Sequence, residues 1–214
     1  MKENLTELVF ILDRSGSMSG LEKDTIGGFN SMLEKQKKES GEAFVTTVLF
    51  DDKYKLLHDR NDIKRVNAIT EKEYYVRGST ALLDAIGITI NNIGIALSDT
   101  NEEERPGKVL FVIITDGMEN SSREFSYEKI KEMVEHQKSK YAWDFIFLGA
   151  NIDAIMTAGS FGISADRAAN FVSDSSGTQL NYKVVSEAVS SIRKGRNVDA
   201  SWKSEIEKDY KKRG

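Results

Sequence analysis

Oxygen-bearing side chains cluster just after an apolar run near the start of the chain. The run at residues 8–12 ends abruptly at Asp13, and Ser15 and Ser17 follow with Gly16 between them. A turn of this composition can aim one carboxylate and two hydroxyls at a common point. Such hard oxygen ligands suit Mg²⁺, Mn²⁺ or Ca²⁺ rather than zinc. The same residues also fit a helix N-cap with a structural aspartate, so this turn alone leaves both interpretations open.

Two other segments each carry an oxygen ligand at a comparable place. Thr80, within residues 78–82, stands where the strongest helical pattern begins, and Asp116 follows a second buried apolar run. Taken singly, the threonine fits a helix cap and the aspartate fits a turn. Whether Thr80 and Asp116 are metal ligands therefore depends on whether the fold brings them to the turn around Asp13.

Strand and helix patterns alternate along the chain. Unbroken apolar runs at 8–12, 108–114 and 143–148 fit strands that are covered on both faces. Residues 44–50 and 54–58 flank a short turn and predict a hairpin. We therefore predict an α/β fold with a doubly wound, mostly parallel sheet, one antiparallel edge strand and helices on both faces. A short sixth strand is expected at 169–172, and helical apolar spacing is found around 26–33, 82–97, 127–134 and 184–192.

This topology would bring the three segments together. The strand that ends at Asp13 and the strand at 108–114 are neighbours in a doubly wound sheet, and ligands bind outside the carboxyl ends of such strands. Asp13 and Asp116 each stand at one of these ends, and Thr80 lies in the loop that feeds the intervening helix. We expect all three segments to meet in one crevice, as a metal site requires.

Residues 9–18 (VFILDRSGSM), 78–82 (GSTAL) and 114–117 (ITDG) resemble the three signature segments of the von Willebrand factor A (VWA) domain in order and spacing. The resemblance spans about residues 5–193. It implies a Rossmann-like VWA fold of the stand-alone intracellular bacterial or phage type, with an intact metal-ion-dependent adhesion site (MIDAS). By the family pattern, the cation is ligated directly by Ser15 and Ser17, directly or through water by Thr80, and through bridging waters by Asp13 and Asp116.

The resemblance also implies a cation-dependent protein-binding module and not an enzyme. Neutral hydroxyl ligands leave a cation under-neutralised, so that it seeks one more anionic oxygen, commonly a Glu or Asp side chain of a partner protein. We expect Mg²⁺ from the oxygen ligation and its availability, with Mn²⁺ or Ca²⁺ as alternatives. Intracellular domains of this kind resemble components of bacterial or phage chaperone, metal-resistance or stress systems, so the expected partner belongs to an ATPase or kinase complex.

The alternative function is a metal-dependent phosphotransferase or phosphatase of the haloacid-dehalogenase type, which also places an aspartate after a buried strand. That chemistry needs a second acid two positions on as a general acid, where this chain has Ser15. A nucleotide-binding Gly-x-x-x-x-Gly-Lys-Ser/Thr loop does not occur. A nuclease would require more clustered carboxylates than Asp13 and Asp116.

Composition excludes several other classes of protein. The 214 residues are 39% hydrophobic and 30% charged, which fits a globular protein, and no apolar run approaches the ~20 residues of a membrane span. The lack of cysteine excludes disulfides and thiol catalysis. Together with the absence of a leader pattern ahead of the first strand, it predicts a cytoplasmic location. His58 and His136 are too far apart for a His-rich metal site, and both are expected at the surface.

Charge is unevenly distributed. A net charge of −4 argues against nucleic acid as the main partner, yet residues 193–214 hold eight basic side chains against four acidic ones. We divide the chain into a VWA domain at 1–194 and a charged, net basic tail at 195–214. The tail fits a solvated helical extension, or else a docking or nucleic-acid tail. Near the metal turn, Arg14, Glu119 and Asn120 are expected on the rim, where Arg14 could steer a partner carboxylate.

Overall fold

Six strands form one sheet in the order β3-β2-β1-β4-β5-β6 in a computed structural model that describes residues 1–214. Neighbouring strands are parallel except for β3, which runs antiparallel to β2 at the edge. This arrangement confirms the predicted sheet, including the adjacency of the first and fourth strands. The strands are β1 (Lys2–Asp13), β2 (Glu42–Phe50), β3 (Tyr54–Asp62), β4 (Pro106–Thr115), β5 (Asp144–Gly149) and β6 (Ala168–Asn170).

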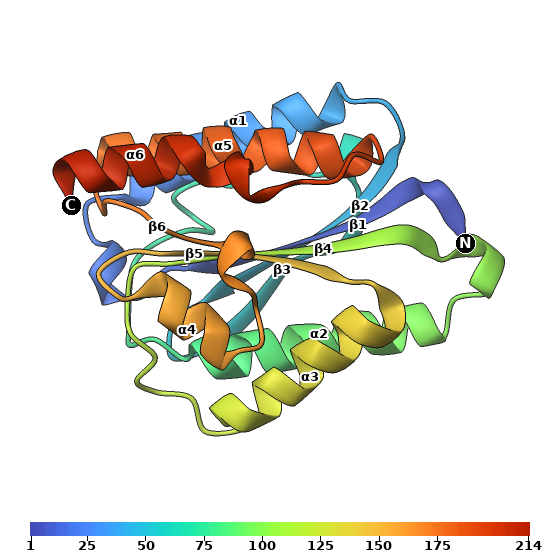
Figure 1. Ribbon diagram of the computed structural model, residues 1–214, viewed down its shortest axis with the longest axis horizontal. Helices are drawn as coiled ribbons and strands as arrows, with labels where there is room; N and C mark the ends of the chain where they lie inside the picture. Colours follow the sequence, from blue (N-terminus) through green and yellow to red (C-terminus); the bar gives the residue numbers. More distant parts are fainter.

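Helices cover both faces of the sheet, so the molecule has three layers (Figure 1). One face carries α1 (Glu22–Lys37), α5 (Ser175–Arg193) and α6 (Ser204–Arg213). The other carries α2 (Leu82–Ser98), α3 (Tyr127–Tyr141) and α4 (Ala154–Ser160). The carboxyl ends of the parallel strands lie together at the left of Figure 1, on the same side of the molecule as the end of α6.

Strand β1 shows why the apolar runs are unbroken. Leu8, Phe10 and Leu12 belong to the core under α1 and α5, whereas Val9 and Ile11 belong to the core on the α2 side. Successive side chains of a strand point to opposite faces, so a central strand between two helical layers must be apolar at every position. The carboxyl half of β1 is therefore a rigid base for the residues that follow Asp13.

The prediction that His58 is a surface residue is wrong, because only 7% of the residue is exposed. Its Nδ1 lies 3.0 Å from the hydroxyl of Thr47 on β2. The segment after β3 folds back over this face and contributes Ile63, Val66 and Ile69 to the core. Burial lowers the pKa of His58, so it packs as a neutral polar residue. His136 is exposed, as predicted.

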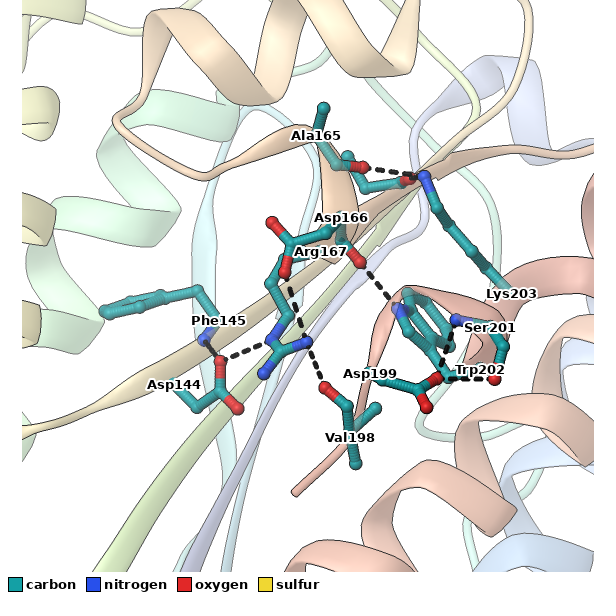
Figure 2. A network of polar contacts seen from close by, with 11 residues as sticks. Asp144, Phe145, Ala165, Asp166, Arg167, Val198, Asp199, Ser201, Trp202 and Lys203 are labelled. Atoms are coloured by element: carbon teal, nitrogen blue, oxygen red, sulfur yellow. Dashed lines mark hydrogen bonds and ion pairs between the residues drawn. The ribbon is translucent and has the colours of Figure 1, made fainter.

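The last helix of the chain, α6, packs against α5 and β6, and Figure 2 shows the polar contacts that residues 198–203 make just before it. The Trp202 indole donates a hydrogen bond to the carbonyl of Asp166 at 2.7 Å, and the Lys203 ammonium donates to Ala165 and Ala168 at 2.6 and 2.7 Å. Arg167 reaches the carbonyl of Val198 at 2.6 Å. Lys203 is only 6% exposed, so these contacts fasten α6 beside α5 and β6. The division of the chain at residue 195 stays a prediction.

No helix combines the length and the apolar character that crossing a lipid bilayer requires.

Candidate metal centre

The predicted site residues lie at the carboxyl ends of β1 and β4, which are hydrogen-bonded neighbours with Leu12 opposite Ile114. Asp13 is the last residue of β1, and Asp116 directly follows the last residue of β4. Thr80 lies in the loop before α2. This loop is bonded to the turn after Asp13, because the amide of Gly16 donates to the carbonyl of Gly78 at 3.1 Å. The tertiary structure thus brings together three segments that are far apart in the sequence.

The first turn directs both serine hydroxyls to the same place. The two Oγ atoms of Ser15 and Ser17 lie 3.0 Å apart. The turn is held by the Ser15 amide, which donates to Oδ1 of Asp13 at 2.7 Å. A short 3₁₀ helix at Gly16–Met18 follows and buries Met18 beneath the loop. Asp13 therefore organises the turn that presents the hydroxyls.

Gly117 marks the point on which three hydroxyls converge. A Cβ atom placed on this glycine would lie 2.9 Å from Oγ of Ser17, 3.1 Å from Oγ1 of Thr80 and 3.8 Å from Oγ of Ser15. Any side chain at position 117 would therefore occupy the space between them. The absence of a side chain keeps open a small cradle that is lined by hydroxyl oxygens.

The two carboxylates differ in how they are satisfied. Both oxygens of Asp13 are engaged, Oδ1 by the Ser15 amide and Oδ2 by the Thr115 hydroxyl at 2.5 Å. Asp116 accepts a hydrogen bond from Ser173 on Oδ2 at 3.1 Å, whereas its Oδ1 is buried without a hydrogen-bond partner. Buried polar atoms are normally paired. Oδ1 of Asp116 is an exception, because it is a buried acceptor without a donor.

Burial sets the electrostatics of this pair. It raises the pKa of Asp13 to about 6, although hydrogen bonds from Thr115 and Ser15 work against the rise. Burial also raises the pKa of Asp116, and the hydroxyls of Ser17 and Ser173 work against the rise. Each buried carboxylate loses hydration when it ionises. A nearby cation would favour the charged form of both groups.

These residues fit a hard divalent cation. They supply three hydroxyls around a cradle that a methyl group would fill, and two nearby carboxylates, one of which has an unpaired buried oxygen. Every donor side chain in this set, which is Asp13, Ser15, Ser17, Thr80 and Asp116, offers oxygen, and three of the five are hydroxyls. That set matches Mg²⁺, Mn²⁺ or Ca²⁺ by ligand preference.

Glu119 and Asn120 were predicted on the rim, and the structure gives them a supporting role. Oδ1 of Asn120 accepts from the Thr80 amide at 2.9 Å, and the Asn120 amide donates to the Thr80 carbonyl at 3.0 Å. Oε2 of Glu119 accepts from the Leu83 amide at 2.9 Å, so it binds the first turn of α2. Asp84 holds the other end of this loop by accepting from three consecutive backbone amides, those of residues 123–125.

The prediction that Arg14 steers a partner from the rim is wrong. Its side chain is 3% exposed and its Nε lies 2.7 Å from Oδ2 of Asp51, a buried carboxylate at the end of β2. The contact is an ion pair without the geometry of a directed hydrogen bond. Arg77, from the Thr80 loop, contacts the same Asp51 oxygen at 3.0 Å. Through Arg14 and Arg77, Asp51 joins the turn after β1 and the loop before α2 to the β2–β3 hairpin. The pairing with Asp51 is needed because a buried arginine without a counter-charge would be costly.

Sequence reasoning missed several supporting residues. Thr115 and Ser173 bind the two aspartates, Tyr74 donates to the carbonyl of Asp13 at 2.6 Å, and Asp51 pairs with Arg14. Thr115 lies within one of the motif segments and could have been noticed there. Tyr74, Asp51 and Ser173 lie in segments with no local signal, and only the fold places them against the site.

No protein-family model matches the chain, and no curated protein matches it in sequence. Solved structures share its fold. A von Willebrand factor type A protein from Catenulispora acidiphila superposes with a TM-score of 0.55 at 14% identity, over 86% of this chain and 42% of that one. Proximal thread matrix protein 1 from the mussel byssus, with a zinc-occupied MIDAS motif, has a TM-score of 0.59 at 14% identity, over 89% of this chain and 47% of that one.

The BatB protein from Bacteroides thetaiotaomicron has a TM-score of 0.50 at 14% identity, and the match covers 88% of this chain and 99% of that one. This chain spans less than half the length of the first two of these structures. At such low identity the likeness shows the fold alone. The chain therefore has a VWA-like fold, as the three sequence segments predicted.

Proposed function

We propose that this protein is a divalent-cation-dependent protein-binding module, in which a cation at the metal centre captures an acidic side chain of a partner. One observation carries the proposal. Three hydroxyls converge on the Gly117 cradle at the carboxyl ends of adjacent strands, next to a buried carboxylate oxygen that has no donor. A VWA-like neighbour with a zinc-occupied MIDAS motif supports divalent metal binding in this fold.

The residues of the chain have distinct parts in this proposal. Ser15, Ser17 and Thr80 would hold the cation with neutral oxygens, and Asp13 and Asp116 would supply the negative charge around it. When bound, the cation would act as the local positive charge that attracts a carboxylate from outside. Ser17 is exposed, whereas Ser15 and Thr80 are buried. The cradle is therefore reached from solvent on the Ser17 side.

We propose binding and not catalysis. In the enzyme alternative Asp13 would be the nucleophile, but each of its oxygens already accepts a hydrogen bond, from Ser15 or from Thr115, which weakens it as a nucleophile. The position two residues after Asp13, where an acid would be needed to protonate a leaving group, is occupied by Ser15. A phosphatase assay with Mg²⁺ tests this point, since turnover that disappears in Asp13→Ala would favour the enzyme alternative.

Calorimetric titration with Mg²⁺ and Mn²⁺ tests the metal centre directly. We expect one site per chain in the wild-type protein and none in Ser15→Ala/Ser17→Ala. The control variant Ser31→Ala/Ser139→Ala removes two exposed helical serines elsewhere and should bind the ion normally. Equal binding by all three proteins would remove the metal from the mechanism.

Capture of a partner is tested by pull-down from the source cell in Mg²⁺ and in chelator. A partner that is retained equally in both conditions, and equally by the Ser15→Ala/Ser17→Ala variant, would contradict the proposal. Magnesium as the ion used in the cell, an ATPase or kinase complex as the partner, a bacterial or phage source and a cytoplasmic location remain predictions from the sequence and its resemblance.

A further inference from the structure

A groove of about 660 Å³ lies beside the metal centre, where the segments after β4, β5 and β6 meet the end of α6. Its volume is within the range of sites that bind small molecules. Its walls include Met118, Ile152, Phe171 and Tyr210. The groove therefore joins loop residues near the strand ends to a helix from the last twenty residues of the chain.

The groove and the metal centre share structural residues. Asn151, in one wall, donates from Nδ2 to the carbonyl of Asp116 at 3.3 Å, and Ser173, in another, donates to Oδ2 of the same residue at 3.1 Å. Met118 follows Asp116 by two residues. The groove and the metal centre therefore meet at Asp116, so a peptide bound at the metal centre would lie next to the groove.

Two polar side chains in the walls already accept hydrogen bonds from the backbone. Oδ1 of Asp153 accepts from the Met156 amide at 3.0 Å, and Oδ1 of Asn170 accepts from the Ala154 amide at 2.8 Å. Asp153 is the only charged side chain among the lining residues. The walls therefore contain no basic group that would favour a polyacidic ligand, and half of the lining residues are apolar.

Apolar side chains are unusually exposed at this place. Met118 is 70% exposed and Tyr210 is 36% exposed. Met156, on the first turn of α4 just after the groove residue Asp153, is 73% exposed. Exposed apolar side chains that gather next to a polar site mark interaction surfaces, and methionine and tyrosine are enriched in protein interfaces. Methionine also adapts its shape to different partners.

We propose that this groove binds an extended segment of the partner protein, which places one Asp or Glu side chain at the metal centre and an apolar side chain, a few residues away, against Met118 and Tyr210. The inference rests on the proposed function, because the metal-bound carboxylate fixes the segment beside the groove. Two linked contacts strengthen each other through their high effective concentration. The groove thus selects, among acidic segments, those with a neighbouring apolar residue.

The full chain is immobilised and used to select short random peptides from a phage library in Mn²⁺, with elution by chelator. We expect the eluted sequences to share one acidic residue and one apolar residue at a fixed spacing. The most enriched peptide is then synthesised with the apolar residue changed to Ser, and dissociation constants are measured by fluorescence anisotropy. This change should weaken binding to the wild-type chain by about tenfold.

Variants of the chain assign that loss to the groove. In Met118→Gln and in Tyr210→Gln, the parent and Ser peptides should bind within about twofold of each other, since the contact is already missing. Ile95→Gln removes a 60% exposed apolar side chain on α2 and should retain the full difference between the two peptides. Met118 and Tyr210 lie on separate segments, the loop after β4 and helix α6. A loss seen in both variants therefore cannot come from a local distortion that one substitution causes in its own segment.

Failure of the groove and failure of the metal site give different results. Eluted peptides that share an acidic residue but no apolar one would overturn the groove and leave the proposed function standing. A lack of acidic, chelator-eluted peptides would overturn both. A chain that is dimeric in sedimentation and becomes monomeric in Met118→Gln would assign the groove to a second copy and overturn the peptide inference.

Discussion

Asn120 and Thr80 hold each other through two hydrogen bonds that run in opposite directions. The side chain of Asn120 accepts from the Thr80 amide at 2.9 Å, and its amide donates to the Thr80 carbonyl at 3.0 Å. The loop that follows Asp116 therefore fixes the backbone of the loop that carries Thr80, although 40 residues separate Asn120 from Thr80. In metal sites, residues that orient a ligand in this way tune metal affinity without touching the ion, and Asn120 would have this part in the proposed metal centre.

We expect Asn120→Ala to lower Mn²⁺ affinity by about tenfold, as is typical for a residue that supports a ligand. The backbone of Thr80 would lose its acceptor, and its hydroxyl would be less firmly placed. Asn120→Asp keeps the accepting oxygen and should retain most of the affinity. Ser121→Ala removes a buried hydroxyl that has no partner and should change nothing. Calorimetric titration with Mn²⁺ measures these affinities. An equal loss of affinity in Asn120→Ala and Asn120→Asp would contradict the orienting role of Asn120.

We expect Gly117→Ala to abolish metal binding while the protein remains folded. The added methyl group would lie 2.9 Å from Oγ of Ser17 and 3.1 Å from Oγ1 of Thr80, within the space that the cation needs. Gly27→Ala is the matched control, because a Cβ there meets nothing within 4 Å and alanine favours the helix. Titration with Mn²⁺ and thermal unfolding separate the two effects. Normal Mn²⁺ binding by Gly117→Ala would place the ion elsewhere.

The buried pair Arg14–Asp51 should be important for stability. Asp51→Ala would leave the Arg14 guanidinium, now 3% exposed, without its counter-charge, and removing one partner of a buried pair costs about 3–5 kcal/mol. Arg14→Met/Asp51→Ala should be more stable than Asp51→Ala, since no charge is left buried. Urea unfolding measures both. The exposed pair Lys129–Glu132 provides the control, and Glu132→Ala should leave the unfolding midpoint unchanged.

Glu7 predicts a pH dependence of stability that is independent of the metal centre. Burial raises its pKa from 4.5 to about 7, against the opposing effect of Arg60. The native state therefore binds a proton that the unfolded chain releases, and stability falls as pH rises from about 4.5 through 7. The full loss is about 3 kcal/mol. Glu7→Gln should remove this part of the pH dependence in urea unfolding at pH values on either side of 7. An identical pH dependence in both proteins would show that Glu7 is ionised when folded.

Lys203 should control whether α6 stays attached. Its ammonium donates to Ala165 and Ala168 and lies 3.0 Å from Oε1 of Glu207. Lys203→Met keeps an apolar chain of similar length but loses these contacts. Hydrogen exchange should then become faster across residues 204–213 and remain unchanged in β1. Lys208→Met, at an exposed position of α6, should leave exchange as in the wild-type protein. Unaltered exchange in Lys203→Met would show that other contacts hold the helix.

The sequence alone determined the sheet and the three oxygen-bearing segments. Unbroken apolar runs such as that of β1 require burial on both faces, and parallel strands place their carboxyl ends at one edge, so Asp13 and Asp116 had to lie near each other. The types of oxygen donor also followed from the residues, whereas the class of cation stays a prediction.

Only the tertiary structure decided what supports and surrounds that centre. The positions of Arg14 and His58 depend on long-range contacts with Asp51 and with the segment after β3, which no local pattern encodes. Asn120 reaches Thr80 across 40 residues. The groove joins Met118 to Tyr210 through the packing of α6. The local spacing of residues determines which segments form helices, strands and turns. The burial of a side chain, its ion-pair or hydrogen-bond partner and its contact with distant residues arise from the packing of the whole chain.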